Sequence, residues 1–216
     1  MFVRKPLEYN LFDLIPYIDE ETMYEHYDVH YKKYTDNMNK AIYDNKIKIY
    51  DSYPLVSLIY QLKNYKRYSI EFRNNGGGYI NHMIYFENLS PQNEDYTKYA
   101  SDNLKNMIDN NFGEYDNFVQ SFKKEGNKVF GSGWVWLLSN GNKLSIVTTA
   151  NQDNPLMYAN TNILLGMDVW EHAYYLKHKA NRSGYINDFF NIIDWSIVSE
   201  RLKSPIYSNN KKMLLS

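Results

Sequence analysis

The first half of the chain repeats apolar positions with the period of an α-helix. Between residues 22 and 45, one face of a predicted helix carries Met23, His26, His30, Tyr34 and Met38. Residues three or four apart share a helix face. Residues 45–75 predict a second helix with an apolar leucine and isoleucine side, and the proline-containing residues 1–20 predict an extended lead-in. We therefore expect a helical first half.

Three consecutive glycines, residues 76–78, interrupt this pattern. Such a run is typical of a flexible loop or a helix break; the alternative is that the missing side chains leave room beside a site. The apolar segment that follows predicts a buried helix in which His82 is embedded. Residues 90–93 predict a turn and a domain boundary, which divides the chain into residues 1–92 and 93–216.

The second half changes from helical to strand patterning. Helices are expected near residues 96–110 and 114–126, followed by two β-type runs at residues 133–140 and 143–150 with an Asn-Gly-Asn turn between them. Residues 162–167 predict a third strand that delivers Asp168 at its end, and helices at residues 170–179 and 185–202 close the chain. The expected fold class is α+β: an N-terminal helical hairpin domain, and a C-terminal domain with a three-stranded antiparallel sheet surrounded by helices.

Composition narrows the chemistry. The 216 residues carry 24 basic and 25 acidic side chains, so no overall charge favours nucleic acid or a membrane surface as a partner. The absence of cysteine excludes disulfides and thiolate metal sites, so a metal would use His, Asp, Glu or water, ligands that suit manganese, non-haem iron or zinc. No apolar run is long enough for a signal peptide or a membrane span. We expect a soluble, intracellular and by default cytoplasmic protein without a signal or transit peptide.

The candidate chemistry centres on Asp168 and His172, four residues apart with Trp170 and Glu171 between them. One helical turn, or a tight strand-to-helix junction, would let both side chains bind one ion. Spacing alone favours plainer interpretations: such a pair more often lies on a helix face, and a histidine in an apolar segment is more often a hydrogen-bonded core residue than a ligand. A metal site therefore needs support beyond spacing.

That support is a resemblance carried by five ordered strings: HYDVHYKKY, GGGYINHMIYF, GSGWVWL, TANQDNPLM and DVWEHAYYLK. Together they resemble the iron/manganese superoxide dismutases over roughly residues 1–203. The resemblance implies that the metal ligands are His26, His82, Asp168 and His172, with a solvent molecule as fifth ligand. It also implies the activity: superoxide is disproportionated to dioxygen and hydrogen peroxide by one ion per subunit that cycles between Mn(III) and Mn(II).

The same resemblance assigns the residues around the metal. Gln152 is expected to donate a hydrogen bond to the metal-bound solvent, and Tyr34 and His30 are expected to continue this network toward the substrate entrance. Arg182 is the positively charged residue expected at that entrance. Val29 replaces a lysine common at that entrance. The cavity walls implied by the resemblance are Trp134, Trp136 and Trp170.

The resemblance further implies a homodimer. Glu171 is expected to reach the partner subunit's His172, and Tyr175 to approach the partner subunit's His30; a tetramer is the alternative. Manganese is favoured over iron because glycine occupies position 78 while the loop supplies the glutamine at position 152. Three alternatives stay open: an enzyme that uses iron, an enzyme that works with either metal, and an inactive protein whose metal serves folding or assembly.

Overall fold

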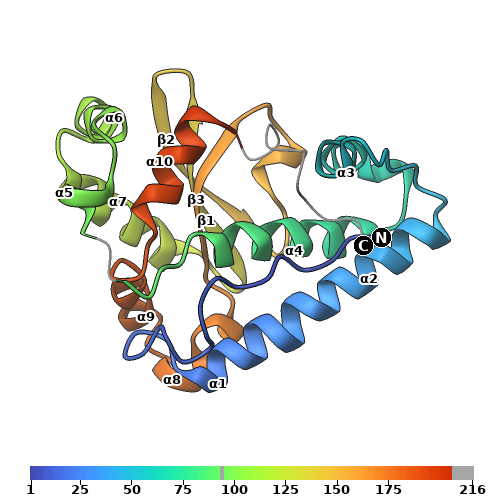
Figure 1. Ribbon diagram of the computed structural model, residues 1–216, viewed down its shortest axis with the longest axis horizontal. Coiled ribbons are helices and arrows are strands. Elements are labelled where there is room, and N and C mark those ends of the chain that lie inside the picture. The colour runs from blue at the N-terminus through green and yellow to red at the C-terminus, as the bar shows by residue number, and fades with distance from the viewer. Residues whose placement is uncertain (93–94, 206–216) are drawn as a thin grey trace.

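The computed structural model describes residues 1–92 and 95–205. The N-terminal half of the chain is a helical hairpin (Figure 1). Its helical elements are α1 (Glu20–Met23), η1 (Tyr24–Tyr31), α2 (Lys32–Asp44), α3 (Pro54–Lys63), η2 (Tyr65–Arg67) and α4 (Ile70–Glu87). The elements α1, η1 and α2 form one continuous arm, which begins where Asp19 Oδ1 accepts the backbone N–H of Thr22 at 2.7 Å. This arm packs against α4, the second arm. The segment η1 is π-helical, a form often found at functional sites, and it carries His26 and His30.

Helix α4 passes through the three glycines without a break, so the predicted interruption is wrong and the alternative is confirmed. A Cβ atom on Gly77 would lie 2.0 Å from the carbonyl oxygen of Gln152. A Cβ atom on Gly78 would lie 2.4 Å from the ring of Tyr34. The glycines are needed because other parts of the chain approach the helix backbone this closely.

The C-terminal half contains the predicted antiparallel sheet, and the expected α+β fold class is confirmed. Its strands are β1 (Gly133–Asn140), β2 (Lys143–Ala150) and β3 (Asn162–Asp168), in the order β2-β1-β3. Trp134 on β1 lies opposite Thr149 on one side and Asp168 on the other. All of β3 and nearly all of β1 are buried, so these two strands form the centre of the core.

Helices surround this sheet (Figure 1). They are α5 (Tyr96–Tyr99), α6 (Asp102–Phe112), α7 (Tyr115–Lys128), η3 (Pro155–Met157), η4 (Glu171–Ala173), α8 (Tyr175–His178), α9 (Arg182–Phe189) and α10 (Trp195–Lys203). The single helices predicted at residues 96–110, 170–179 and 185–202 are each divided. New N-caps explain two of the divisions: Ser101 accepts the backbone N–H of Leu104 to begin α6, and Asp194 accepts that of Ile197 to begin α10.

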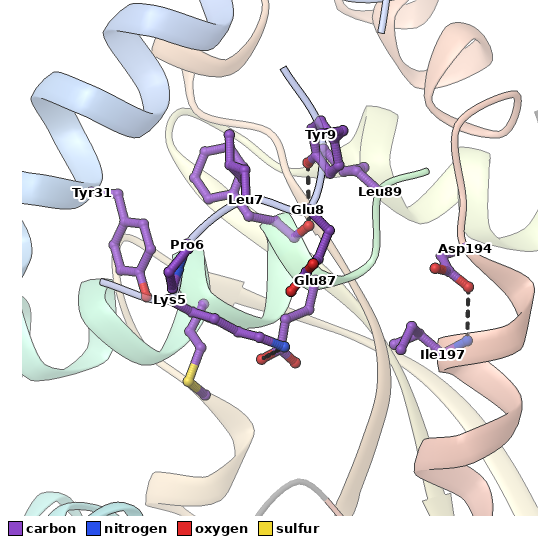
Figure 2. Close-up of a pocket in the computed structure, with 12 residues that line it drawn as sticks. Lys5, Pro6, Leu7, Glu8, Tyr9, Tyr31, Glu87, Leu89, Asp194 and Ile197 are labelled. Atoms are coloured by element: carbon purple, nitrogen blue, oxygen red, sulfur yellow. Dashed lines mark hydrogen bonds and ion pairs between the residues drawn. The ribbon is translucent and has the colours of Figure 1, made fainter. Parts of the chain in front are cut away.

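The N-terminal segment runs along α4 and helps to join the two halves. Figure 2 shows the pocket of about 100 Å³ that it encloses near the C-terminal end of α4. Lys5 Nζ lies 3.1 Å from Glu87 Oε1, and Glu87 Oε2 lies 2.7 Å from Arg201 Nη2 of α10. None of the residues that line this pocket is a predicted site residue.

The domain boundary predicted at residues 92 and 93 stays a prediction, because residues 93 and 94 lie outside the described residues. Among the residues that the structure describes, no helix combines the length and the apolar character needed to cross a membrane.

Candidate metal centre

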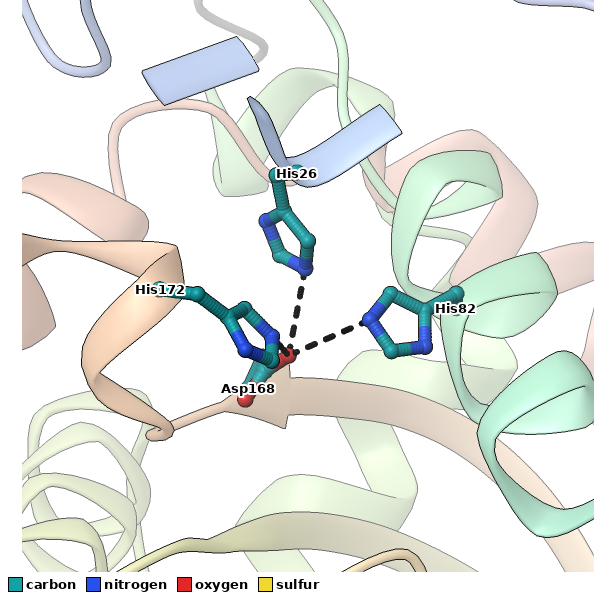
Figure 3. Close-up of side chains that lie close together, drawn as sticks. All are labelled: His26, His82, Asp168 and His172. Carbon is teal, nitrogen blue, oxygen red and sulfur yellow. Dashed lines mark hydrogen bonds and ion pairs between the residues drawn. The ribbon is translucent and has the colours of Figure 1, made fainter. Parts of the chain in front are cut away.

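Four predicted side chains converge where the two halves of the chain meet (Figure 3). His26 comes from η1, His82 from α4, Asp168 from the end of β3 and His172 from η4. One nitrogen or oxygen atom from each lies within 4.8 Å of the corresponding atoms of the other three. His26, His82 and Asp168 are buried, and the side chain of His172 is 10% exposed.

The strand-to-helix junction, not a helix face, brings Asp168 and His172 together. The backbone N–H of Trp170 donates to Asp168 Oδ1 at 2.8 Å, which orients the carboxylate where β3 ends. The short η4 turn then returns the chain, so that His172 Nε2 lies 3.0 Å from Asp168 Oδ2. On the other side, His26 Nε2 lies 3.1 Å from the same oxygen. One carboxylate oxygen is therefore the common neighbour of both imidazoles.

Burial and the contacts among the four side chains determine the charges of this cluster. Burial lowers the pKa of His26 to about 4 and that of His82 well below its ordinary value, because a buried imidazolium loses its hydration. Burial would raise the pKa of Asp168, but attraction and hydrogen bonds from His172 and His26 outweigh it and hold that pKa well below its usual range. At neutral pH, His26 and His82 are neutral and Asp168 is ionised. A buried site with this negative charge suits a cation.

The orientation of the His82 ring tests whether these residues fit a metal. His82 Nδ1 lies 2.6 Å from the carbonyl oxygen of Gly78, which can only accept, so the ring proton is on Nδ1. His82 Nε2 therefore presents a lone pair, buried and without a hydrogen-bond partner in the described part of the chain, and it lies 3.8 Å from Asp168 Oδ2. A positive ion between or beside these two electron-pair donors would satisfy both of them. This mixed set of imidazoles and a carboxylate fits a first-row metal such as manganese or iron.

Gln152 lies beside the cluster and is hydrogen-bonded at both ends of its amide. Its Nε2 donates to the hydroxyl of Tyr34 at 3.1 Å, and its Oε1 accepts from the indole N–H of Trp134 at 3.1 Å. The rings of Tyr34 and His82 are 5.0 Å apart. Asn151, with a φ of +53°, makes the tight turn that presents Gln152 to the interior. The Gln152–Tyr34 contact of the expected network is therefore present, whereas the bond from Gln152 to a metal-bound solvent and the continuation through His30 stay predictions.

Aromatic rings enclose the cluster. The ring of His30 stacks on that of His172 with centroids 4.3 Å apart, and the ring of Trp170 stacks on that of His172 with centroids 5.5 Å apart. Trp134 lies 5.3 Å from His82. Trp136 packs behind Trp134, with ring centroids 5.3 Å apart. The three predicted wall residues therefore lie in two layers. Trp134 and Trp170 contact ligand imidazoles, and Trp136 packs behind Trp134.

The remaining predicted residues lie outside the cluster. Glu171 is exposed and its carboxylate is 3.4 Å from Ser132 Oγ. Tyr175 is 51% exposed. The guanidinium of Arg182 donates to the carbonyl oxygens of Val129 and Gly131, so Arg182 holds the segment that precedes β1.

Two buried residues that the sequence analysis did not single out belong to the Gln152 network: Asn81 and Asn154. Asn81 Nδ2 donates to Gln152 Oε1 at 3.0 Å, and Asn154 Nδ2 donates to Asn81 Oδ1 at 2.8 Å. A sequence signal existed for Asn81, which precedes His82 in an apolar helix. A polar side chain in a fully buried segment needs hydrogen-bond partners, and so marks a network.

Comparison with known proteins agrees with this geometry. The alpha-hairpin domain of the iron/manganese superoxide dismutases matches residues 2–90, and the C-terminal domain of the same family matches residues 100–201. The chain is 41% identical over 209 residues to superoxide dismutase (Mn) of Acinetobacter baylyi, covering 95% of this chain and 89% of the relative. It is 43% identical over 202 residues to superoxide dismutase (Mn) 1 of Leptolyngbya boryana, covering 91% and 78%.

A third relative carries a broader metal designation. Superoxide dismutase (Mn/Fe) 2 of Staphylococcus aureus is 40% identical over 187 residues, covering 87% of this chain and 90% of the relative. Both family domains match in order, and together they span nearly all of the described fold. The chain belongs to the iron/manganese superoxide dismutase family.

Proposed function

We propose that this protein is a superoxide dismutase in which His26, His82, Asp168 and His172 bind one manganese ion per chain. Two superoxide ions and two protons yield dioxygen and hydrogen peroxide. The observation that carries the proposal is the pair of buried electron-pair donors, His82 Nε2 and Asp168 Oδ2, which face each other at 3.8 Å. Membership of the family supports the reaction.

When bound, a redox-active ion accepts an electron from one superoxide and returns it to another. The residues of the chain contribute position and exclusion of water. Asp168 is oriented by the backbone of Trp170, and His82 by the carbonyl oxygen of Gly78, so both ligands are held before a metal arrives. The buried rings of Trp134 and Trp136 keep bulk water from the hydrogen bonds of Gln152.

Two side chains are suited to proton supply. Burial raises the pKa of Tyr34 to about 12, so its hydroxyl keeps its proton at neutral pH while it accepts from Gln152. Burial lowers the pKa of His30 to about 4, so this imidazole is neutral at neutral pH and carries one N–H that can donate a hydrogen bond. His30 and Tyr34 are both partly exposed, so both side chains can exchange protons with water.

The glycines of α4 support manganese over iron. In the resemblance, the iron type carries its glutamine four residues before the second ligand, which here is position 78. A side chain at Gly78 would meet the Tyr34 ring at 2.4 Å, so the glutamine comes from the loop at position 152 instead. Two of the relatives named above carry manganese in their names and a third carries both metals, which supports the same choice.

Replacement of a ligand and of its neighbour tests the proposal. His82→Ala is expected to lose metal and dismutase activity together, whereas Gln152→Ala keeps the metal and changes turnover. His178→Ala, which removes a histidine outside the cluster, serves as the matched control and keeps both. Full activity in metal-free His82→Ala would contradict the proposed site.

We also propose that the protein is a homodimer. Phe130 is 101% exposed, and Tyr175 and Glu171 are exposed beside the metal site. Aromatic side chains are enriched in protein–protein interfaces, and a fully exposed ring such as that of Phe130 suits a surface that a second subunit covers. Phe130→Asp is expected to convert a sedimentation-velocity dimer to a monomer. A dimer of unchanged affinity would contradict this use of Phe130, and a tetramer in the wild type would extend the assembly.

A further inference from the structure

Three buried amide side chains form a row that ends at Tyr34. Asn154 Nδ2 donates to Asn81 Oδ1 at 2.8 Å, and Asn81 Nδ2 donates to Gln152 Oε1 at 3.0 Å. Gln152 Nε2 then donates to the hydroxyl of Tyr34 at 3.1 Å. Asn81 and Asn154 have no exposed surface, and Gln152 is 3% exposed. Because bulk water does not reach the row, each amide depends on its neighbours for hydrogen bonds.

An amide side chain fits its space in two orientations that exchange its oxygen and its NH₂ group. Three groups of unchangeable polarity select one orientation along this row. The backbone N–H of Leu156 donates to Asn154 Oδ1 at 2.9 Å. The indole N–H of Trp134 donates to Gln152 Oε1 at 3.1 Å. The backbone carbonyl of Gln152 accepts from Asn81 Nδ2 at 3.2 Å.

We propose that Asn154 is a positioning residue for Gln152. Through Asn81, it keeps the NH₂ group of Gln152 turned toward Tyr34 and the metal cluster. Reversal of Asn154 would place its oxygen against Asn81 Oδ1 and its NH₂ group against the N–H of Leu156. The catalytic consequence rests on the proposed dismutase function, whereas the orientation of the amides does not.

Capping alone does not require an amide at this position. Asn154 is the N-cap of η3, a place where serine, threonine or aspartate serves equally well. Asparagine differs because it accepts from Leu156 with one end and donates to Asn81 with the other. The second bond joins the cap to the row of amides.

Asn154→Asp tests the proposal with almost no change in shape. When ionised, the aspartate keeps an oxygen that caps η3 and replaces the donor with a second acceptor that faces Asn81 Oδ1. Because burial raises the pKa of a carboxyl and the protonated form would donate as the amide does, both readouts are taken over a pH range that reaches the ionised form. Asn111→Asp is the matched control, because Asn111 accepts from the backbone of Leu144 at 3.1 Å and donates to the carbonyl oxygens of Met107 at 2.8 Å and Asn142 at 3.3 Å. Both substitutions remove one donor and retain one accepting oxygen.

The first readout needs no metal. The chain has four tryptophans, so metal-free protein labelled with ¹⁵N-tryptophan gives four indole N–H signals, and Trp134→Phe identifies the one from Trp134. Asn154→Asp is expected to shift this signal, because Asn81 loses the bond from Asn154 and so orients Gln152 Oε1 toward the indole less firmly. Asn111→Asp leaves it in place. A folded Asn154→Asp protein whose Trp134 signal matches the wild type would overturn the proposal.

The second readout uses the manganese-loaded protein. With unchanged metal content, Asn154→Asp is expected to shift the midpoint potential away from the wild-type value and to lower kcat about tenfold or more. A wild-type potential and kcat would overturn the proposal. If the aspartate variant does not fold, Asn154→Ala decides: it should shift the Trp134 signal in the same direction by a smaller amount, and an unshifted signal refutes the proposal. A shifted signal together with an inactive wild type would refute the dismutase function and leave the role of Asn154 standing.

Discussion

Gly77→Ala adds one methyl group where two parts of the chain meet most closely. The new Cβ atom would lie 2.0 Å from the carbonyl oxygen of Gln152. Carbon and oxygen in ordinary contact are about 3.3 Å apart, so the two segments must separate by about 1.3 Å. The loop cannot yield easily, because Asn81 Nδ2 binds the same carbonyl at 3.2 Å and Arg73 Nη2 binds Asp153 at 2.6 Å.

The expected cost follows from two opposing effects. Alanine in place of glycine stabilises a helix interior by about 0.5–1 kcal/mol, whereas overpacking a core costs about 1–3 kcal/mol. We expect the free energy of unfolding of the metal-free protein to fall by about 1–2 kcal/mol in urea titrations. Because a displacement of about 1 Å at a functional group can cost about 100-fold, turnover per bound manganese should fall about 10- to 100-fold.

Gly76→Ala is the control within the same helix. Its Cβ atom would meet only Leu62 Cδ2 at 2.8 Å, the end of a flexible side chain that can turn away. Its stability should stay within about 0.5 kcal/mol of the wild type, with unchanged turnover. If Gly77→Ala were as stable and as active as Gly76→Ala, the close approach of Gln152 would not explain the glycine at position 77.

Three other perturbations probe other parts of the fold. Arg201→Ala leaves the carboxylate of Glu87 with Lys5 alone as its ion-pair partner and is expected to lower the free energy of unfolding by about 3–5 kcal/mol in urea titrations; a loss below about 1 kcal/mol contradicts the buried pair. Val29→Lys should raise kcat/KM at low salt, and the gain should vanish near 1 M salt, where the Debye length is about 3 Å; a gain that salt does not change excludes electrostatic steering. Burial raises the pKa of Tyr96 from 10.0 to about 12, so the folded state keeps a proton that the unfolded chain has released, and stability falls as pH rises through this range. Tyr96→Phe should reduce that fall in pH-dependent unfolding experiments, and an unchanged pH dependence would show that Tyr96 does not contribute to it.

Local patterns predicted the strands better than the helices. Strands β1 and β2 begin and end where their apolar runs and the Asn-Gly turn place them, because turn and strand signals act over a few residues. Ser101 and Asp194 start new helices inside segments with continuous helical spacing. The helical period of apolar residues does not reveal such caps, since it continues on both sides of each capping residue.

The glycines and the site depend on contacts that are distant in sequence. Gly77 and Gly78 are required by Gln152 and Tyr34, which come from other segments. His26 and Asp168 lie 142 positions apart, so spacing along the chain could not pair them, and only resemblance to a family did so. Asn154 was missed because an asparagine in a loop ordinarily indicates a turn.

Metal analysis joined to an activity assay tests whether the four-residue cluster holds a catalytic metal. Protein reconstituted with manganese, and separately with iron, would be assayed for bound metal per chain and for superoxide dismutation. We expect one manganese ion per chain and activity in the manganese form. Bound metal without activity in either form would contradict a dismutase and favour a metal that serves folding, and activity with iron alone would reverse the choice of metal.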